Sequence, residues 1–179
     1  MHRSSLQLME RLAGTMLGAL NGDETTIPLN DREVGSRAFR VLDVGSLDIN
    51  GNYREFFPDC EYVGLDIQDG NNVDIVVDPW DWGDIGEFDM IISGQCLEHS
   101  QYPWKTARLM LDHCVEDGWL AITAPSRQAR HNYPSDYFRF FETGLESLFE
   151  GQITVVESGG TLGLHQDDAW ILARNQPAI

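Results

Sequence analysis

The stretch FRVLDVGSLDINGNYREFF, from Phe39 to Phe57, decides the fold of this chain. An apolar run passes through Asp43 and ends at Gly45, and Gly51 then opens a short helix-like piece after a turn-forming segment. The next apolar run, EYVGLDI, ends in Asp66, about 20 residues beyond the first glycine. Strand, glycine turn, helix, strand and acid, in that order, predict an α/β domain that binds a ligand containing a ribose.

Apolar runs and helical patterns alternate over the rest of the chain, which predicts a parallel sheet covered by helices. An amphipathic helix over 6–20 precedes a polar connector, so we divide the chain into residues 1–38, the N-terminal helix and connector, and 39–179, the ligand-binding domain. Further helices are predicted over 104–115, with Cys114 and Val115 on the apolar stripe, and over 142–149. The predicted strands are 39–44, 61–66, 73–77, 88–93, 118–124, 152–158 and 168–174.

The last two predicted strands follow one another with only a glycine-rich loop between them. Strands joined without a crossover pair antiparallel, so the parallel sheet should end in one antiparallel hairpin. The link QDGNN after the second strand is too short for a helix. One face of the sheet would therefore lack cover unless the N-terminal helix packs there, and the apolar face of that helix otherwise fits a lid or a homodimer contact.

Charge restricts the partners of the chain. Asp and Glu number 29 against 12 Lys and Arg, a formal net charge of −17 at pH 7. Such a surface repels polyanions, which argues against nucleic acid and against anionic membranes. Apolar runs are shorter than the roughly 20 residues of a membrane span, and Glu10 and Arg11 interrupt the N-terminal apolar residues, so we expect neither a span nor a signal peptide.

Cysteine usage indicates a cytoplasmic protein. Cys60, Cys96 and Cys114 form no CxxC pair and no zinc spacing, so neither a disulfide framework nor a metal site is expected.

Five segments in this order resemble the class I S-adenosylmethionine-dependent methyltransferases, and within them the small-molecule branch typified by methyltransferase domain type 11. They are VLDVGSLDINGNYR, YVGLDI, DIVVDPWDW, FDMIISGQCLEH and DGWLAITAPS. The resemblance covers about Phe39 to Arg174 and implies a Rossmann-like three-layer sandwich with a seven-stranded, mostly parallel sheet. It also implies S-adenosylmethionine as cofactor and a small-molecule methyl acceptor. One departure is that Leu47 and Asp48 stand where the family often has a further glycine.

Individual residues of these segments suit parts of that cofactor. Gly45 lets the backbone approach a ligand closely, and amides near Gly51 and Asn52 would receive its carboxylate at a helix N-terminus. Asp66 can accept hydrogen bonds from both ribose hydroxyls, and Asp78 from the adenine amine. The resemblance places Asp43 on the ammonium side. The full cofactor-binding set predicted is Asp43, Gly45, Ser46, Asp48, Gly51, Asn52, Asp66, Ile67, Asp78, Trp80, Ser93, Gly94 and Gln95.

Methyl transfer needs a base only when the acceptor is protonated in its resting state. The candidate catalytic residues are His99, which the resemblance places in the site region, and His131 and Tyr133 from the loop RQARHNYPSDY. His165 is a further candidate, although a histidine near the closing loop can equally be a solvated surface residue. A packing or capping role for His99 remains equally open. The aromatic residues beyond that loop fit a small packing cluster, with an ion pair between Asp136 and Arg139.

Other functions remain open from the sequence. A nicotinamide-dependent oxidoreductase shares the strand, glycine and acid pattern, although GxGxxG is missing. A non-catalytic protein that binds a nucleoside ligand, or an aminopropyl transferase, could use the same fold. The acidic surface and the polar loop RQARHNYPSDY, which would roof the cleft, lead us to expect transfer to an oxygen or nitrogen atom.

Overall fold

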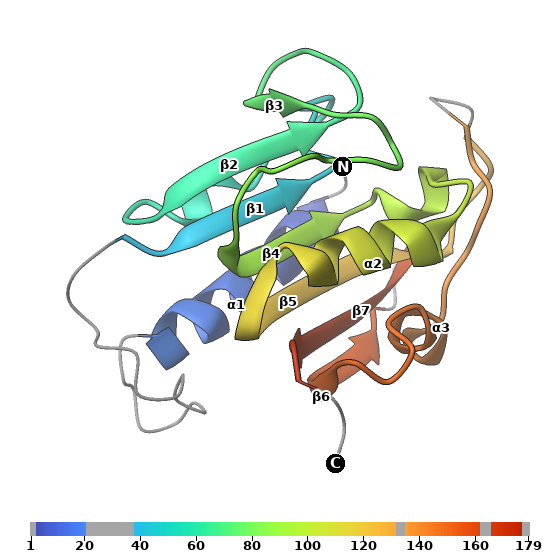
Figure 1. Cartoon of the computed structure of the whole chain (residues 1–179). Coiled ribbons are helices and arrows are strands. Elements are labelled where there is room, and N and C mark those ends of the chain that lie inside the picture. Colours follow the sequence, from blue (N-terminus) through green and yellow to red (C-terminus); the bar gives the residue numbers. More distant parts are fainter. Residues whose placement is uncertain (1–2, 21–37, 132–134, 162–165, 177–179) are drawn as a thin grey trace.

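The computed structural model describes residues 3–20, 38–131, 135–161 and 166–176 (Figure 1). Its centre is a seven-stranded sheet with the order β3-β2-β1-β4-β5-β7-β6. β7 runs antiparallel to both of its neighbours, whereas the other neighbouring pairs are parallel. The strands are β1 (Arg40–Val44), β2 (Glu61–Asp66), β3 (Ile75–Val76), β4 (Phe88–Gly94), β5 (Cys114–Arg127), β6 (Thr154–Gly160) and β7 (Asp167–Arg174). The Rossmann-like sheet with one antiparallel hairpin strand is therefore confirmed.

Helices lie on both faces of this sheet and complete a three-layer sandwich (Figure 1). α1 (Arg3–Leu20) covers one face, and α2 (Pro103–Asp112) and α3 (Glu142–Ser147) cover the other. Two single 3₁₀ turns, η1 (Arg54–Phe56) and η2 (Leu97–His99), follow β1 and β4.

The alternation of side chains along the central strands builds two separate apolar cores. Every residue of β4 is buried. Its Met90 and Ile92 join the core beneath α1, while Ile91 joins the core beneath α2 and α3. A strand buried on both faces reads as a continuous apolar run, which is why FDMIISG was recognisable in the sequence.

α1 supplies the cover that the short connections leave out. Residues 67–74 between β2 and β3 form no helix, and the link from β1 to β2 holds only the three-residue η1. Met9, Leu12 and Met16 of α1 are fully buried against this face. The helix is also fastened near its start, where Ser5 Oγ donates a 2.5 Å hydrogen bond to the buried Asp168 of β7. Of the roles left open by the sequence, the structure shows α1 packed on this face of the sheet.

Three sequence-based boundaries are wrong. Cys114 and Val115 were expected on the helix but belong to β5, because α2 ends at Asp112 and Cys114 pairs with Phe88 of β4. No helix opens at Gly51, since the only turn of helix there is η1. The glycines expected in the last hairpin loop at 159 and 160 lie in β6 and pair with β7.

Gly64 in β2 faces the backbone of the following loop at very short range. A Cβ atom at this position would lie 1.9 Å from the backbone oxygen of Asn72. Two hydrogen bonds of 2.7 Å join Gly64 to Asp74, one to its carboxylate and one from its amide. The loop that follows β2 is thus packed directly onto a strand that has no side chain at this point.

We expect Gly64→Ala to lower the free energy of unfolding by at least about 1–3 kcal/mol, because overpacking displaces backbone. Gly14→Ala is the matched control, since Gly14 lies exposed in α1 with nothing within 4 Å of the added Cβ. Alanine is the better helix former, so this second change should raise stability by about 0.5–1 kcal/mol. Urea denaturation of the two variants measures both effects, and equal changes in the two would contradict the packing described.

Asp43 is a buried acid in the middle of the sheet, with 2% of its surface exposed. The Tyr62 hydroxyl donates a hydrogen bond to Oδ2, while Oδ1 has no hydrogen-bond partner among the residues described. Burial raises the pKa of Asp43 from 3.8 to about 7, against the opposing effect of the Tyr62 hydrogen bond. Between these two values the folded chain retains a proton that the unfolded chain has released, so folding stability falls as the pH rises.

Wild-type stability should therefore decline relative to that of Asp43→Asn between about pH 4 and pH 7, by up to ~1.4 kcal/mol per pH unit, and level off above. Asparagine carries no titrating proton, so the variant lacks this slope. Asp69→Asn, on an exposed residue, should run parallel to the wild type. Denaturation midpoints across this pH range test the expectation, and parallel curves for wild type and Asp43→Asn would refute it.

Candidate active site

A cavity of about 690 Å³ opens at the carboxyl ends of β1, β2 and β4. β1 pairs with β2 on one side and with β4 on the other, so the strand order reverses at this point. The loops that leave neighbouring strands diverge at such a reversal and form the ligand crevice of open α/β sheets. Of the predicted site residues, those that line the cavity are Gly45, Gly51, Asp66, Ile67, Trp80, Gly94, Gln95, His99 and His131.

The turn after β1 brings backbone to the wall of the cavity. Gly45 has a φ of +81°, and a Cβ there would lie 2.5 Å from Cys96 Sγ. The amides of Gly45 and Ser46 both donate to the carbonyl of Leu65, at 2.9 and 3.1 Å. These bonds hold the turn against the end of β2, so a glycine is required here for both conformation and space.

Asp48 stabilises the second half of the same turn. Its carboxylate accepts hydrogen bonds from Asn52 Nδ2 at 2.8 Å and from the Gly51 amide at 2.7 Å, and these bonds lower the pKa of Asp48. The Gly51 amide, predicted to receive a ligand carboxylate at a helix N-terminus, is therefore engaged by Asp48. Neither Asp48 nor Asn52 lines the cavity, and both act on the shape of the turn.

Asp66 lies at the end of β2 and lines the cavity with a fixed carboxylate. Oδ2 accepts a hydrogen bond from the Leu47 amide at 3.1 Å, and Oδ1 accepts one from the Gln68 amide at 3.0 Å. Each carboxylate oxygen can accept more than one hydrogen bond, so both remain able to receive a hydroxyl group. Ile67, 48% exposed, follows on the same wall.

An aromatic wall lies beyond Asp66. Trp80 is 38% exposed at the cavity, and its ring lies 5.1 Å from that of Tyr102. Trp82 also lines the cavity but is 5% exposed and belongs to the core. Asp78 is exposed and does not line the cavity, because its Oδ1 accepts the Trp80 amide at 2.9 Å and holds the turn.

The exit of β4 forms the floor of the cavity. Ser93 is fully buried and donates to the carbonyl of Val44 at 2.9 Å, so it joins β4 to β1 rather than facing a ligand. A Cβ at Gly94 would lie 2.0 Å from the Tyr53 hydroxyl. Gln95 has a φ of +58° and accepts a hydrogen bond from Gln166 Nε2 at 3.0 Å.

Gln166 is a cavity residue that sequence reasoning missed. Its Nε2 also donates to Asp168 Oδ1 at 2.8 Å, and Asp168 binds Ser5 of α1. The start of α1 is thereby connected to the floor of the cavity through buried side chains. Nothing in the local sequence around Gln166 indicates this link, because Gln95 and Ser5, at its two ends, come from distant segments.

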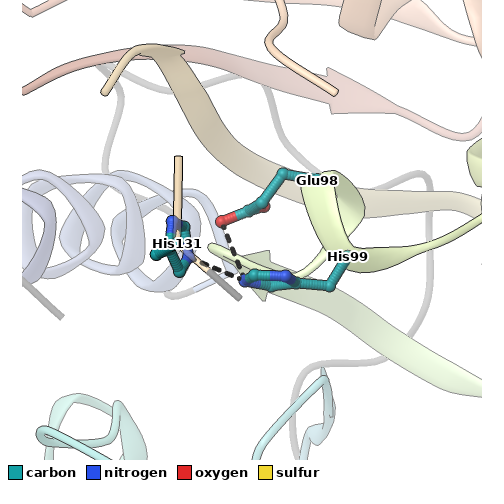
Figure 2. Close-up of side chains that lie close together, drawn as sticks. All are labelled: Glu98, His99 and His131. Carbon is teal, nitrogen blue, oxygen red and sulfur yellow. Dashed lines mark hydrogen bonds and ion pairs between the residues drawn. The ribbon is translucent and has the colours of Figure 1, made fainter. Parts of the chain in front are cut away.

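One end of the cavity carries two histidines and an acid (Figure 2). His99 belongs to η2, and its Nε2 lies 3.1 Å from Nε2 of His131, from the segment after β5. The carboxylate of Glu98 lies 3.7 Å from His99 Nε2. Glu98 is 1% exposed, and burial raises its pKa to about 8, whereas burial lowers the pKa of His99.

Residues beyond this cluster hold the two histidines in place. His99 Nδ1 hydrogen-bonds to the backbone oxygen of Ser135. His131 Nδ1 lies 3.3 Å from Asp136, which Arg139 binds through both of its terminal nitrogens at 2.5 and 2.7 Å. This ion pair, predicted from the sequence, is confirmed, and the Arg139 hydrogen bonds hold the pKa of Asp136 well below its ordinary value. Tyr133 and His165 lie outside the described residues.

Sequence reasoning brought His99 and His131 into one site but gave Glu98 no role. The adjacent position of Glu98 was visible, whereas its complete burial depends on how η2 packs beneath the segment after β5. Asp43, Ser46, Asp78 and Ser93 do not line the cavity; Asp78 and Ser93 bond to the backbone of Trp80 and Val44, which do.

Several solved structures have the same architecture as this chain. The chain is similar to N-methyltransferase NodS from Bradyrhizobium japonicum, solved with S-adenosyl-l-homocysteine, at a TM-score of 0.66 and 15% identity, over 96% of this chain and 85% of that one. It is similar to the 1,6-didemethyltoxoflavin-N1-methyltransferase of Burkholderia thailandensis at a TM-score of 0.70 and 14% identity, over 97% and 80%. A third similar structure is that of the [4+2]-cyclase SpnF, at a TM-score of 0.63 and 13% identity, over 96% of this chain and 82% of that one.

No protein-family model matches the sequence, and a search of curated proteins finds no match either. Within the described residues, no helix is both long and apolar enough to cross a membrane. Strand order, the antiparallel β7 and these structural similarities agree: the chain has the fold of the class I S-adenosylmethionine-dependent methyltransferases.

Proposed function

We propose that this protein is an S-adenosylmethionine-dependent methyltransferase that acts on an oxygen or nitrogen atom of a small molecule. The observation that carries the proposal is the pairing of Asp66 with the Gly45 turn across one cavity at the strand-order reversal. A backbone amide of the turn and the carboxylate are joined directly, through Leu47, so the two halves of a nucleoside site are fixed relative to each other.

The residues present fit the cofactor. Asp66 accepts the ribose hydroxyls, and each such charge-assisted bond contributes about 1.5–3 kcal/mol. Trp80 and its apolar neighbours in the wall suit the adenine ring. Gly45, where a Cβ would meet Cys96, lets the amino-acid end approach the backbone. When bound, the cofactor supplies a methyl group already activated by a sulfonium.

The chain itself then has to align the acceptor and exclude water, and alignment alone can lower a barrier by about 7–11 kcal/mol. We place the acceptor at the end of the cavity that His99 and His131 line. Gly94 and Gln95, at the exit of β4, line the same cavity and precede His99 in the chain. An acceptor hydroxyl would need a base, and these two imidazoles are the candidates. Tyr133, expected in the same role, remains a prediction.

Specific observations bear on two alternative functions, a nicotinamide-dependent oxidoreductase and a non-catalytic protein that binds a nucleoside ligand. The nicotinamide-dependent folds that share the glycine and acid pattern have the order 3-2-1-4-5-6, whereas here β7 inserts antiparallel between β5 and β6, which favours the methyltransferase. A protein that binds a nucleoside ligand without methyl transfer keeps a second place, because the similar SpnF is a cyclase. The free cysteines fit a cytoplasmic location, which we propose with the activity, and a homodimer remains a prediction.

Asp66→Ala should weaken the binding of S-adenosylhomocysteine at least tenfold in isothermal titration calorimetry, because both ribose hydrogen bonds are lost. Asp69→Ala removes the same charge from an exposed residue three positions on and should bind as the wild type does. Equal affinity of the wild type and Asp66→Ala would remove the basis of the proposal.

Incubation with methyl-labelled S-adenosylmethionine and a panel of hydroxyl- and amine-bearing metabolites tests the transfer itself. We expect S-adenosylhomocysteine to be released with at least one acceptor, while the Asp66→Ala variant should turn over more slowly at limiting cofactor. Binding of S-adenosylhomocysteine without release on any acceptor would favour the non-catalytic alternative.

A further inference from the structure

Glu98, His99 and His131 have the arrangement of metal ligands, although no spacing in the sequence indicates it (Figure 2). The three come from η2 and from the segment after β5, and their ligand atoms all lie within 4.8 Å of one another. We propose that these side chains bind one divalent transition-metal ion of the zinc class at the acceptor end of the cavity. The inference rests on the proposed function only for the role of the ion, not for its binding.

One hydrogen bond of His99 and one close contact of His131 favour lone pairs that point into the cluster. The backbone oxygen of Ser135 can only accept, so His99 Nδ1 carries the proton and Nε2 offers a lone pair. His131 Nδ1 faces the carboxylate of Asp136, which favours the same tautomer. When both protons are on Nδ1, the two Nε2 atoms, 3.1 Å apart, present lone pairs to each other, and a cation bound by both removes their repulsion. Outer contacts of this kind, to a carbonyl and to a carboxylate, are those that orient histidine ligands of metals.

Glu98 gives independent support. The side chain is 1% exposed, and neither carboxylate oxygen has a hydrogen-bond partner within the described part of the chain. A buried carboxylate without hydrogen bonds is costly, and such groups in native proteins call for an ion or another partner. The ligand atoms of the acid and of the two imidazoles lie within 4.8 Å of one another, so one cation between them would satisfy all three groups at once.

The ligand set indicates the class of metal. Two imidazole nitrogens and one carboxylate suit Zn²⁺, Fe²⁺, Co²⁺ or Ni²⁺, whereas Mg²⁺ and Ca²⁺ prefer oxygen ligands. Nitrogens bound to one tetrahedral ion at ~2.1 Å lie about 3.4 Å apart, close to the 3.1 Å between the two Nε2 atoms. Three protein ligands leave a coordination position open. All three line the cavity, so an oxygen atom of the acceptor can complete the shell.

This arrangement narrows the acceptor to a small molecule with a hydroxyl, enol or carboxylate oxygen near the methylated atom.

The test is a titration of the full-length, tag-free chain, freed of metal by a chelator, with ZnCl₂ and separately with CoCl₂. Calorimetry should give one strong site per chain, and Co²⁺ should give visible absorption of a nitrogen- and oxygen-ligated ion without a thiolate band. Glu98→Gln and His131→Asn should each weaken binding at least tenfold. His113→Asn removes a histidine outside the cluster, one that stacks on Trp82, and should leave the strong site intact.

Thermal unfolding provides a second readout that does not depend on activity. Excess Zn²⁺ should raise the melting temperature of the wild type and of His113→Asn but not that of Glu98→Gln, since an ion that binds only the folded state stabilises it. If Glu98→Gln does not fold, His131→Asn serves as the ligand variant in its place, because the His131 side chain is 38% exposed and its replacement disturbs the core less. Absence of a strong site, or a strong site that survives both ligand variants, would overturn the proposal.

Binding of S-adenosylhomocysteine by the same samples separates this proposal from the proposed function. If the metal site fails and the nucleoside still binds, only the metal inference is lost. If the metal binds and the nucleoside does not, the proposed methyltransferase activity is lost and the metal site stands.

Discussion

The reversal of strand order between β1 and β4 is the constraint on which the rest of this structure depends. Chain segments leave β1 toward β2 and leave β4 toward β5, in opposite directions along the sheet, and a cavity remains between them. The two strands at this point must approach closely, so their exits carry residues without side-chain bulk. Gly45 and Gly94 fill this role, one facing Cys96 and the other the Tyr53 hydroxyl.

The sheet can hold this geometry because both of its faces are covered in spite of unusually short connections. Many α/β domains place a helix after each strand, whereas here the links after β1 and β2 hold one 3₁₀ turn and a loop. α1 compensates from outside the alternating pattern, with its apolar side against β4 and β5. Its bond through Ser5 to Asp168, and onward to Gln166 and Gln95, couples that cover to the floor of the cavity.

Much of the fold was predictable because it follows from patterns that lie within single segments. The buried run of β4 and the direct link between β6 and β7 determine the central strand and the antiparallel hairpin. The ends of elements were less predictable. Cys114 fits the apolar stripe of a helix, and only its pairing with Phe88 in β4 places it in β5. Gly51 resembles a helix start, but Asp48 captures its amide.

The site divides in the same way. Asp66 could be assigned from the sequence because its separation from Gly45 along the chain is characteristic. Both residues belong to one continuous strand–turn–strand segment, so the pattern is visible without knowledge of the rest of the fold. The assignment of Asp43 and Asp78 to a ligand failed to anticipate that each has a nearer partner, the Tyr62 hydroxyl and the Trp80 amide. Glu98 was missed because an acid in a 3₁₀ turn is ordinarily solvated. Its burial depends on Tyr137 and Phe138, whose amides both bind the backbone oxygen of Glu98 across the segment after β5.

The two ends of the cavity therefore differ in what determines them. The end with Asp66 and Gly45, where we propose that the nucleoside binds, is built from strand exits and glycine turns, which any chain of this topology must possess in some form. The end where we propose that the acceptor binds is built from η2 and the segment after β5, whose conformation the topology leaves free, and here it gathers an acid and two histidines. Structures as different in chemistry as an N-methyltransferase and a [4+2]-cyclase are similar to this chain in fold. Under the proposed function, the chemistry that selects the acceptor therefore lies with Glu98, His99 and His131 rather than with the fold itself.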